Sequence, residues 1–157
     1  MRMVVLGIGN PLMRDDGIGV QVAGALRDRL ADKHVKVVIG ETDVAYCLDC
    51  ICAADFVAVL DAARMGAEPG SVGLLPLQKA DSGCKKPFAM HDINVLDAMA
   101  AEYPAIKGCL IGIEPADAGL GLDLSAPLQN RFEWICAEAE RLIVSIRQKI
   151  DGALEQA

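Results

Sequence analysis

The first twenty residues constrain the fold of this chain more than any other segment. The apolar run from Met3 to Leu6 leads into a glycine-containing turn at 7–11, and small and apolar residues resume at Gly17. A buried strand that ends in a glycine turn and restarts as a helix is typical of α/β folds, which present their sites at the carboxyl edge of the sheet. Here the turn is followed by two adjacent carboxylates, Asp15 and Asp16. A phosphate-binding loop is kept free of negative charge, so the opening favours a cation over a nucleotide.

The rest of the chain alternates between strand-like and helix-like segments, which indicates an α/β sandwich. We expect one mostly parallel, twisted sheet with helices on both faces, a three-layer arrangement. A segment flanked by glycine and proline, 71–78, is expected to add an antiparallel edge strand. With no linker or repeat in 157 residues, 1–157 is predicted to form a single domain. The other expected strands are 3–8, 35–39, 55–61 and 107–113, and the expected helices are 16–30, 45–53, 91–102 and about 127–154.

Composition and charge limit the partners. The net charge is −7 and no basic cluster is visible, which argues against binding to nucleic acid or to an anionic membrane. No apolar stretch approaches the roughly 20 residues that span a bilayer. The start of the sequence runs straight into the first strand, so no secretory leader is expected. These features predict a soluble, cytoplasmic protein.

Six cysteines raise the question of disulfides, metal binding or redox chemistry. Cys47 and Cys50 have C-x-x-C spacing, but no second pair completes a four-thiolate zinc site. Cys109 and Cys136 lie in apolar segments, where a thiol acts as a small hydrophobic group. We expect free structural thiols, with a functional Cys47–Cys50 pair as the alternative.

Four polar residues follow strand ends or open a helix, and these are the candidate site. Asp16 follows the first strand, Asp61 closes a very apolar strand, His91 opens a helix, and Glu114 follows Ile113. Because parallel strands share a carboxyl edge, the four can converge. Two carboxylates and an imidazole suit a divalent transition metal such as zinc or nickel. The alternative for the aspartates and the histidine is helix capping or dipole stabilisation, and Glu114 is expected to end its strand.

These residues belong to blocks that resemble the hydrogenase maturation endopeptidases. The stretch GIGNPLMRDDGIGV at 7–20 is similar to the opening signature of that family, and DAARMGAEPGSV at 61–72 is similar to its second block. His91 with its apolar helix, and GIEP at 112–115, complete the order. The resemblance extends from the start of the chain to about residue 146. Asp16 stands where the family also uses glutamate, and Gly40-Glu41-Thr42 only partly matches a G-G-T motif.

The resemblance implies an endopeptidase of aspartyl type with one narrow task. It would remove a short C-terminal extension from the precursor of a [NiFe] hydrogenase large subunit, its partner, after nickel has been inserted. It further implies that Asp16, Asp61 and His91 are both the metal-contacting and the catalytic residues. The nickel would be supplied by the substrate, with zinc or cadmium as surrogates, and the enzyme would act as a monomer.

Two other functions remain open at this point. One is a non-catalytic checkpoint or chaperone in hydrogenase assembly that uses the same ligands. The other is a nucleotide-binding domain, although Leu12 replaces the third glycine of a G-x-G-x-x-G pattern. Neither G-x-S-x-G nor H-E-x-x-H is present, so the motifs give no support to a serine protease or an ordinary zinc protease.

Overall fold

A computed structural model describes residues 1–77 and 95–156, and its centre is one five-stranded sheet. The strands lie in the order β2-β1-β3-β5-β4. Four of them are mutually parallel, and β4 runs antiparallel to β5 at the edge. The strands are β1 (Met3–Ile8), β2 (Val35–Glu41), β3 (Phe56–Ala62), β4 (Val72–Pro76) and β5 (Lys107–Ile113).

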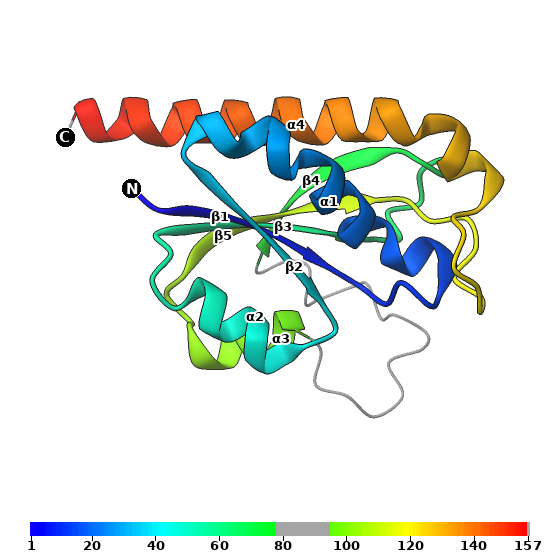
Figure 1. Cartoon of the computed structure of the whole chain (residues 1–157). Coiled ribbons are helices and arrows are strands. Elements are labelled where there is room, and N and C mark those ends of the chain that lie inside the picture. Colours follow the sequence, from blue (N-terminus) through cyan, green and yellow to red (C-terminus); the bar gives the residue numbers. More distant parts are fainter. Residues whose placement is uncertain (78–94, 157) are drawn as a thin grey trace.

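Helices cover both faces of the sheet and complete three layers (Figure 1). The helices α1 (Ile18–Leu30) and α4 (Ala126–Glu155) pack on one face. The shorter helices α2 (Val44–Ile51) and α3 (Val95–Glu102) pack on the other. The 3₁₀ turn η1 (Arg14–Gly17) precedes α1, and η2 (Ala31–Lys33) follows it.

The burial of the strands explains why the sheet is covered on both sides. All six residues of β1 are buried, and only the first residue of β3 is not. Successive side chains of a strand point to opposite faces, so Met3 and Val5 enter the core under α1 and α4. Val4 and Leu6 enter the core against α2 and α3. A continuous apolar run is what a parallel strand between two helical layers requires.

The structure confirms the predicted α/β sandwich and its antiparallel edge strand, with small differences in bounds. The expected strands 3–8 and 107–113 have the predicted ends, whereas β2 continues to Glu41. The first helix begins at Ile18 rather than at Asp16, because Asp15 and Asp16 belong to the 3₁₀ turn and their carboxylates accept hydrogen bonds from loops. Of the expected helix 91–102, residues 91–94 lie outside the described part of the chain.

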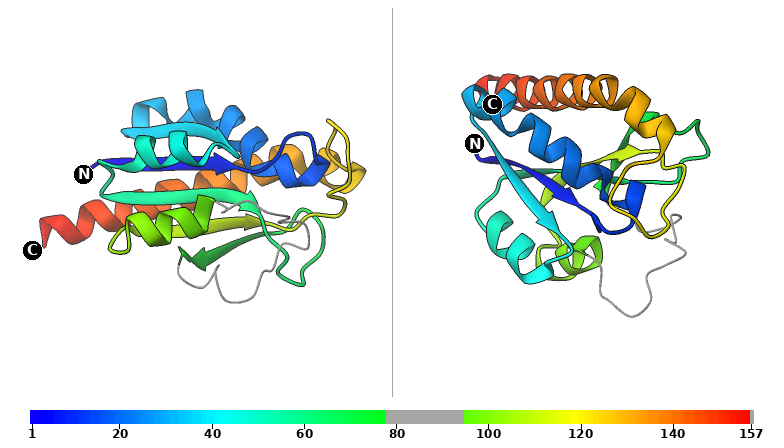
Figure 2. Two further views of the ribbon diagram at one scale, coloured as in Figure 1. Left: turned by 90° about the horizontal axis from the view of Figure 1, so that it is seen from below. Right: turned by 45° about the vertical axis from the view of Figure 1, so that its right-hand side comes forward.

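The carboxyl edge of the sheet gathers loops from distant parts of the sequence. The turn after β1, the loop after β3 and the segment after β5 lie together there, to the right in Figure 1 and again in both views of Figure 2. Within the described residues, no helix combines the length and hydrophobicity needed to cross a membrane.

Candidate active site

Three of the four candidate residues lie at the carboxyl edge of the sheet. Asp16 is in η1, directly after the turn that follows β1, and Asp61 is the penultimate residue of β3. Glu114 follows the last residue of β5. His91 lies outside the described residues, so its position relative to the carboxylates stays a prediction.

Asp16 is half-buried and is fixed by the turn that precedes it. The Asn10 backbone N–H donates to Asp16 Oδ2 at 2.9 Å, and the Asp16 N–H donates to the Met13 carbonyl at 3.0 Å. The Asn10 side chain in turn accepts from the Leu12 N–H at 2.9 Å. The aspartate is therefore positioned by hydrogen bonds within its own turn rather than placed on a freely moving loop.

Asp61 is 1% exposed at the end of the apolar strand β3. A carboxylate buried to this extent is costly unless its charge is compensated or used, and such positions are typical of functional sites. η1 contacts β3 directly. At Gly19 an added Cβ would stand 2.1 Å from the Leu60 carbonyl oxygen. This close approach of α1 to β3 puts the segments that carry Asp16 and Asp61 next to each other.

The neighbouring Asp15 has a different, structural role that the sequence did not assign. Its side chain is fully buried, and Oδ2 accepts hydrogen bonds from the N–H groups of Ala116 and Asp117, both at 2.8 Å. The Ser125 hydroxyl donates to Oδ2 at 2.6 Å, and the Ser125 N–H donates to Oδ1 at 2.8 Å. Asp15 thereby joins the Asp16 turn to the segment between β5 and α4. We call these four contacts the Asp15 clamp.

Glu114 also serves the architecture of the edge, and it directly follows the last residue of β5, as the sequence predicted. Its Oε2 accepts from the Met65 N–H, and its backbone carbonyl accepts from the Gly70 N–H at 2.8 Å. Its own N–H donates to the Ser71 carbonyl at 2.9 Å. Glu114 thus holds the loop that follows Asp61.

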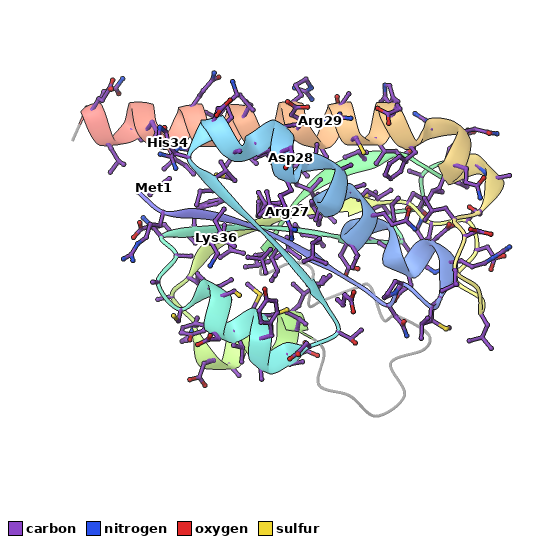
Figure 3. The ribbon with its side chains drawn as sticks, viewed as in Figure 1. Met1, Arg27, Asp28, Arg29, His34 and Lys36 are labelled. Carbon is purple, nitrogen blue, oxygen red and sulfur yellow. The ribbon has the colours of Figure 1, made fainter. Side chains whose placement is uncertain are left out.

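Metal-ligand geometry is incomplete among the described residues, which contain no group of three His, Cys, Asp or Glu side chains that could hold an ion. One of the chain's two histidines, His91, falls outside them. The other, His34, is exposed directly before β2, at the amino edge of the sheet, as Figure 3 shows. His34 is therefore no candidate for a third ligand, and His91 remains the imidazole that could join the carboxylates.

Among the described cysteines, Cys47, Cys109 and Cys136 are buried, as expected of structural thiols. Cys47, Cys50, Cys52, Cys109 and Cys136 are all free. Cys47 is fully buried, and burial raises the pKa of its thiol to about 11. A redox cysteine needs an accessible thiolate, which this environment disfavours. The C-x-x-C spacing therefore gives no support to a functional pair.

The glycine-containing turn is filled by the protein itself. Gly9 has a φ of 130°, and a Cβ there would stand 1.9 Å from the Asp16 carbonyl oxygen. Its N–H donates to the Glu41 carbonyl at 3.0 Å. Glu41 has a φ of 51°, in the left-handed region that favours glycine, which accounts for a glycine in the G-G-T motif at this place. The turn packs against its own chain, and this argues against close approach of a pyrophosphate.

Comparison with known proteins gives one consistent result. The family model described as hydrogenase maturation protease (HycI) matches residues 20–142. The hydrogenase expression/formation protein HupD of Thiocapsa roseopersicina is 32% identical over 123 residues, 73% of this chain and 55% of that protein. HupD of Rhizobium leguminosarum bv. viciae is 29% identical over 166 residues, 97% of this chain and 81% of that protein.

Solved structures show the same fold. The hydrogenase maturating endopeptidase HybD from E. coli superposes with a TM-score of 0.72 at 21% identity, covering 95% of this chain and 94% of that one. The family model spans most of the sequence, including Asp61 and the segment after β5. The chain therefore belongs to the hydrogenase maturation protease family and is a peptidase.

Proposed function

We propose that this peptidase removes the C-terminal extension from the nickel-loaded precursor of a [NiFe] hydrogenase large subunit. In this proposal Asp16, Asp61 and His91 contact the nickel that the precursor already carries. The metal belongs to the substrate, so its presence reports that the cofactor is complete before cleavage. We place the reaction in the cytoplasm and assign it to the monomer.

One observation carries the proposal: Asp61, almost fully buried at the end of β3, lies beside the turn that positions Asp16. Both carboxylates stand at the carboxyl edge, where α/β sheets place their sites. The negative donors suit a divalent cation, and with an imidazole they form a set that nickel accepts. Zinc or cadmium would occupy the same donors as surrogates. Family membership is the support for peptidase activity, and the donor set is the support for contact with nickel.

The chemistry at this site has two forms that use the same residues. A substrate metal can act as a Lewis acid on the scissile carbonyl. Asp16 or Asp61 can take the proton of the attacking water as a general base, which makes the enzyme an aspartyl-type peptidase. The fixed position of Asp16 and the burial of Asp61 favour either role, because a preorganised carboxylate needs no rearrangement when the substrate arrives.

The test replaces Asp61 by asparagine, which keeps the shape and removes the charge. Purified wild-type protein and Asp61→Asn are incubated with a nickel-loaded large-subunit precursor, and the large subunit is weighed by mass spectrometry. We expect loss of a C-terminal peptide with the wild type and a reduction of at least about a hundredfold with Asp61→Asn, the usual range for a positioned acid–base group. Asp28→Asn, on the exposed side of α1, is the matched control and is expected to cleave normally.

Two results would contradict the proposal. Processing at the wild-type rate by Asp61→Asn would remove this residue from the site. A stable complex of wild-type protein and nickel-loaded precursor, with the extension intact, would instead indicate a non-catalytic checkpoint.

A further inference from the structure

Three leucines stand exposed together at the carboxyl edge. Leu12, Leu120 and Leu122 are 58%, 85% and 70% exposed, respectively. They come from two segments more than a hundred residues apart, which a β-bridge between Met13 and Gly121 holds side by side. We call these three residues the leucine rim. Figure 2 shows the segment before α4 lying against the turn before α1.

The contacts of the backbone hold the leucine rim in place. The Gly121 N–H donates to the Leu12 carbonyl, and the Arg14 N–H donates to the Gly121 carbonyl, both at 2.9 Å. Arg14 also pairs with Asp117 at 2.6 Å, and the Asp15 clamp ties the two segments together beneath. Because both segments are fixed, the leucines remain in water in this structure. Grouped exposed apolar side chains on a fixed surface are typical of an interaction site.

A hollow continues the rim toward the helices. It measures about 380 Å³ and lies where Leu122, Leu124 and Phe132 meet Gln21 and Gln129. Its lining is mixed, so an apolar side chain seated against Leu122 and Phe132 would also lie beside polar residues. Asp123 is the charged residue of this lining, and no lysine or arginine is among the residues that form it. This chemistry fits a partner segment with apolar side chains and neutral or basic neighbours.

The position of the leucine rim indicates which polypeptide would bind to it. Leu12 precedes Asp16 by four residues in the same hydrogen-bonded turn. A polypeptide seated on the leucines is therefore adjacent to the carboxylates of the candidate active site. Another exposed leucine, Leu154, lies near the end of α4, at the far end of the molecule (Figure 1).

We propose that the leucine rim and the adjoining hollow form the docking surface for an apolar segment of the hydrogenase large-subunit precursor. This inference rests on the proposed function, since the rim borders the carboxylates assigned to cleavage there. A precursor bound to this rigid surface would have its scissile bond placed beside the carboxylates. The leucines themselves would not contact the reacting atoms. The rim should therefore govern affinity for the precursor and leave the chemical step unchanged.

The experiment compares the double variant Leu120→Ser/Leu122→Ser with the matched control Leu154→Ser. All three leucines are exposed, so the substitutions are expected to leave folding nearly unchanged. Steady-state cleavage of the nickel-loaded precursor gives KM and kcat. Biolayer interferometry on immobilised precursor gives Kd whether or not cleavage occurs.

We expect KM and Kd to rise about tenfold or more for the double variant, because tenfold corresponds to about 1.4 kcal/mol and burial of one leucine contributes at least that. The value of kcat should stay within about twofold, and Leu154→Ser should match the wild type.

The outcomes separate this inference from the proposed function. If the double variant has the same KM and Kd as the wild type, the leucine rim is not the docking surface, and the protease assignment still stands. Binding without cleavage by the wild type would overturn the protease assignment. The Kd values of the wild type and the double variant would still show whether the leucine rim binds the precursor. No binding by the wild type would overturn both. Sedimentation velocity adds one more result: self-association lost in the double variant, with precursor binding intact, would show that a second copy of the chain occupies the rim.

Discussion

Neighbouring residues of one turn carry different functions. Asp15 points into the protein and accepts four hydrogen bonds, while Asp16 is held by Asn10 at the surface of the same turn. A 3₁₀ turn rotates adjacent side chains by about 120°, so two consecutive aspartates cannot face the same way. Asp15 holds the loops of the edge together, and Asp16 remains available to take part in the reaction.

The Asp15 clamp predicts a large effect of a small substitution. In Asp15→Asn, an amide N–H₂ group replaces one carboxylate oxygen and faces backbone donors that it cannot satisfy. We expect the free energy of unfolding to fall by about 2–4 kcal/mol, since each lost hydrogen bond to a charged group contributes about 1.5–3 kcal/mol and some relaxation follows. Urea denaturation followed by circular dichroism measures this. Asp28→Asn should stay within about 0.5 kcal/mol of the wild type. Equal stability of the two variants would show that the clamp is not stabilising.

Among the elements, the contact of α1 with the sheet decides the geometry of the site. Helix α1 touches β1, β2 and β3, and the absence of a side chain at Gly19 lets its first turn approach the Leu60 carbonyl. The turn with Asp16 immediately precedes this helix, and Asp61 immediately follows Leu60. Any displacement of α1 therefore moves one carboxylate relative to the other.

Two glycines of α1 provide a matched test of this contact. In Gly19→Ala the Cβ would lie 2.1 Å from the Leu60 oxygen and 2.7 Å from the Ile8 oxygen, so the helix must shift. We expect a loss of roughly 2–3 kcal/mol in the free energy of unfolding and weaker cleavage. In Gly24→Ala the nearest atom is 3.9 Å away, and the better helix propensity should stabilise the protein by about 0.5–1 kcal/mol. Thermal unfolding of both variants is the measurement, and a stabilised Gly19→Ala would contradict the tight contact.

At the scale of the whole molecule, two apolar cores separated by the sheet support one polar edge. Cys109 and Cys136 lie in the core under α1 and α4, and Cys47 lies in the core against α2 and α3. Burial is the largest cause that raises the pKa of each of these thiols, to about 11. Their ordinary value is near 9, so the folded protein keeps these protons longer than the unfolded chain. The stability linked to them is intact below pH 9 and is lost as the pH rises toward 11.

These thiols report on both cores in one experiment. At pH 8, a thiol with a pKa of about 11 is ionised in about one molecule in a thousand. Among the five cysteines that the structure describes, alkylation with iodoacetamide, mapped by peptide mass spectrometry, should modify the exposed Cys52 first. Cys47, Cys109 and Cys136 should react at least about a hundredfold more slowly, because they must wait for opening of the structure. In urea the difference should vanish. If Cys136 of the folded protein is alkylated as fast as Cys52, the core under α1 and α4 is open to the reagent.

Much of this architecture could be predicted from local patterns. The strand Met3–Ile8 and the strand Lys107–Ile113 have the predicted ends, because continuous apolar runs mark strands buried on both faces. The start of α1 could not be predicted, since η1 forms through hydrogen bonds with residues near 116 and 125. The positions of Asp16 and Asp61 at one edge followed from the parallel order of the strands. The role of Asp15 did not, because nothing in its neighbourhood along the chain distinguishes it from Asp16.

The sequence by itself determined the alternation of strands and helices, the apolar faces of α1 and α4, and the family signature around Asp16 and Asp61. These properties depend on periodicity and on residue type, which are local. Only the tertiary structure decided that Asp15 turns inward to clamp the segment before α4, and that the exposed Leu12 lies beside the segment that carries Leu120 and Leu122. Both arrangements join residues more than a hundred positions apart, and such contacts exist only once the chain has brought its distant loops to one edge of the sheet.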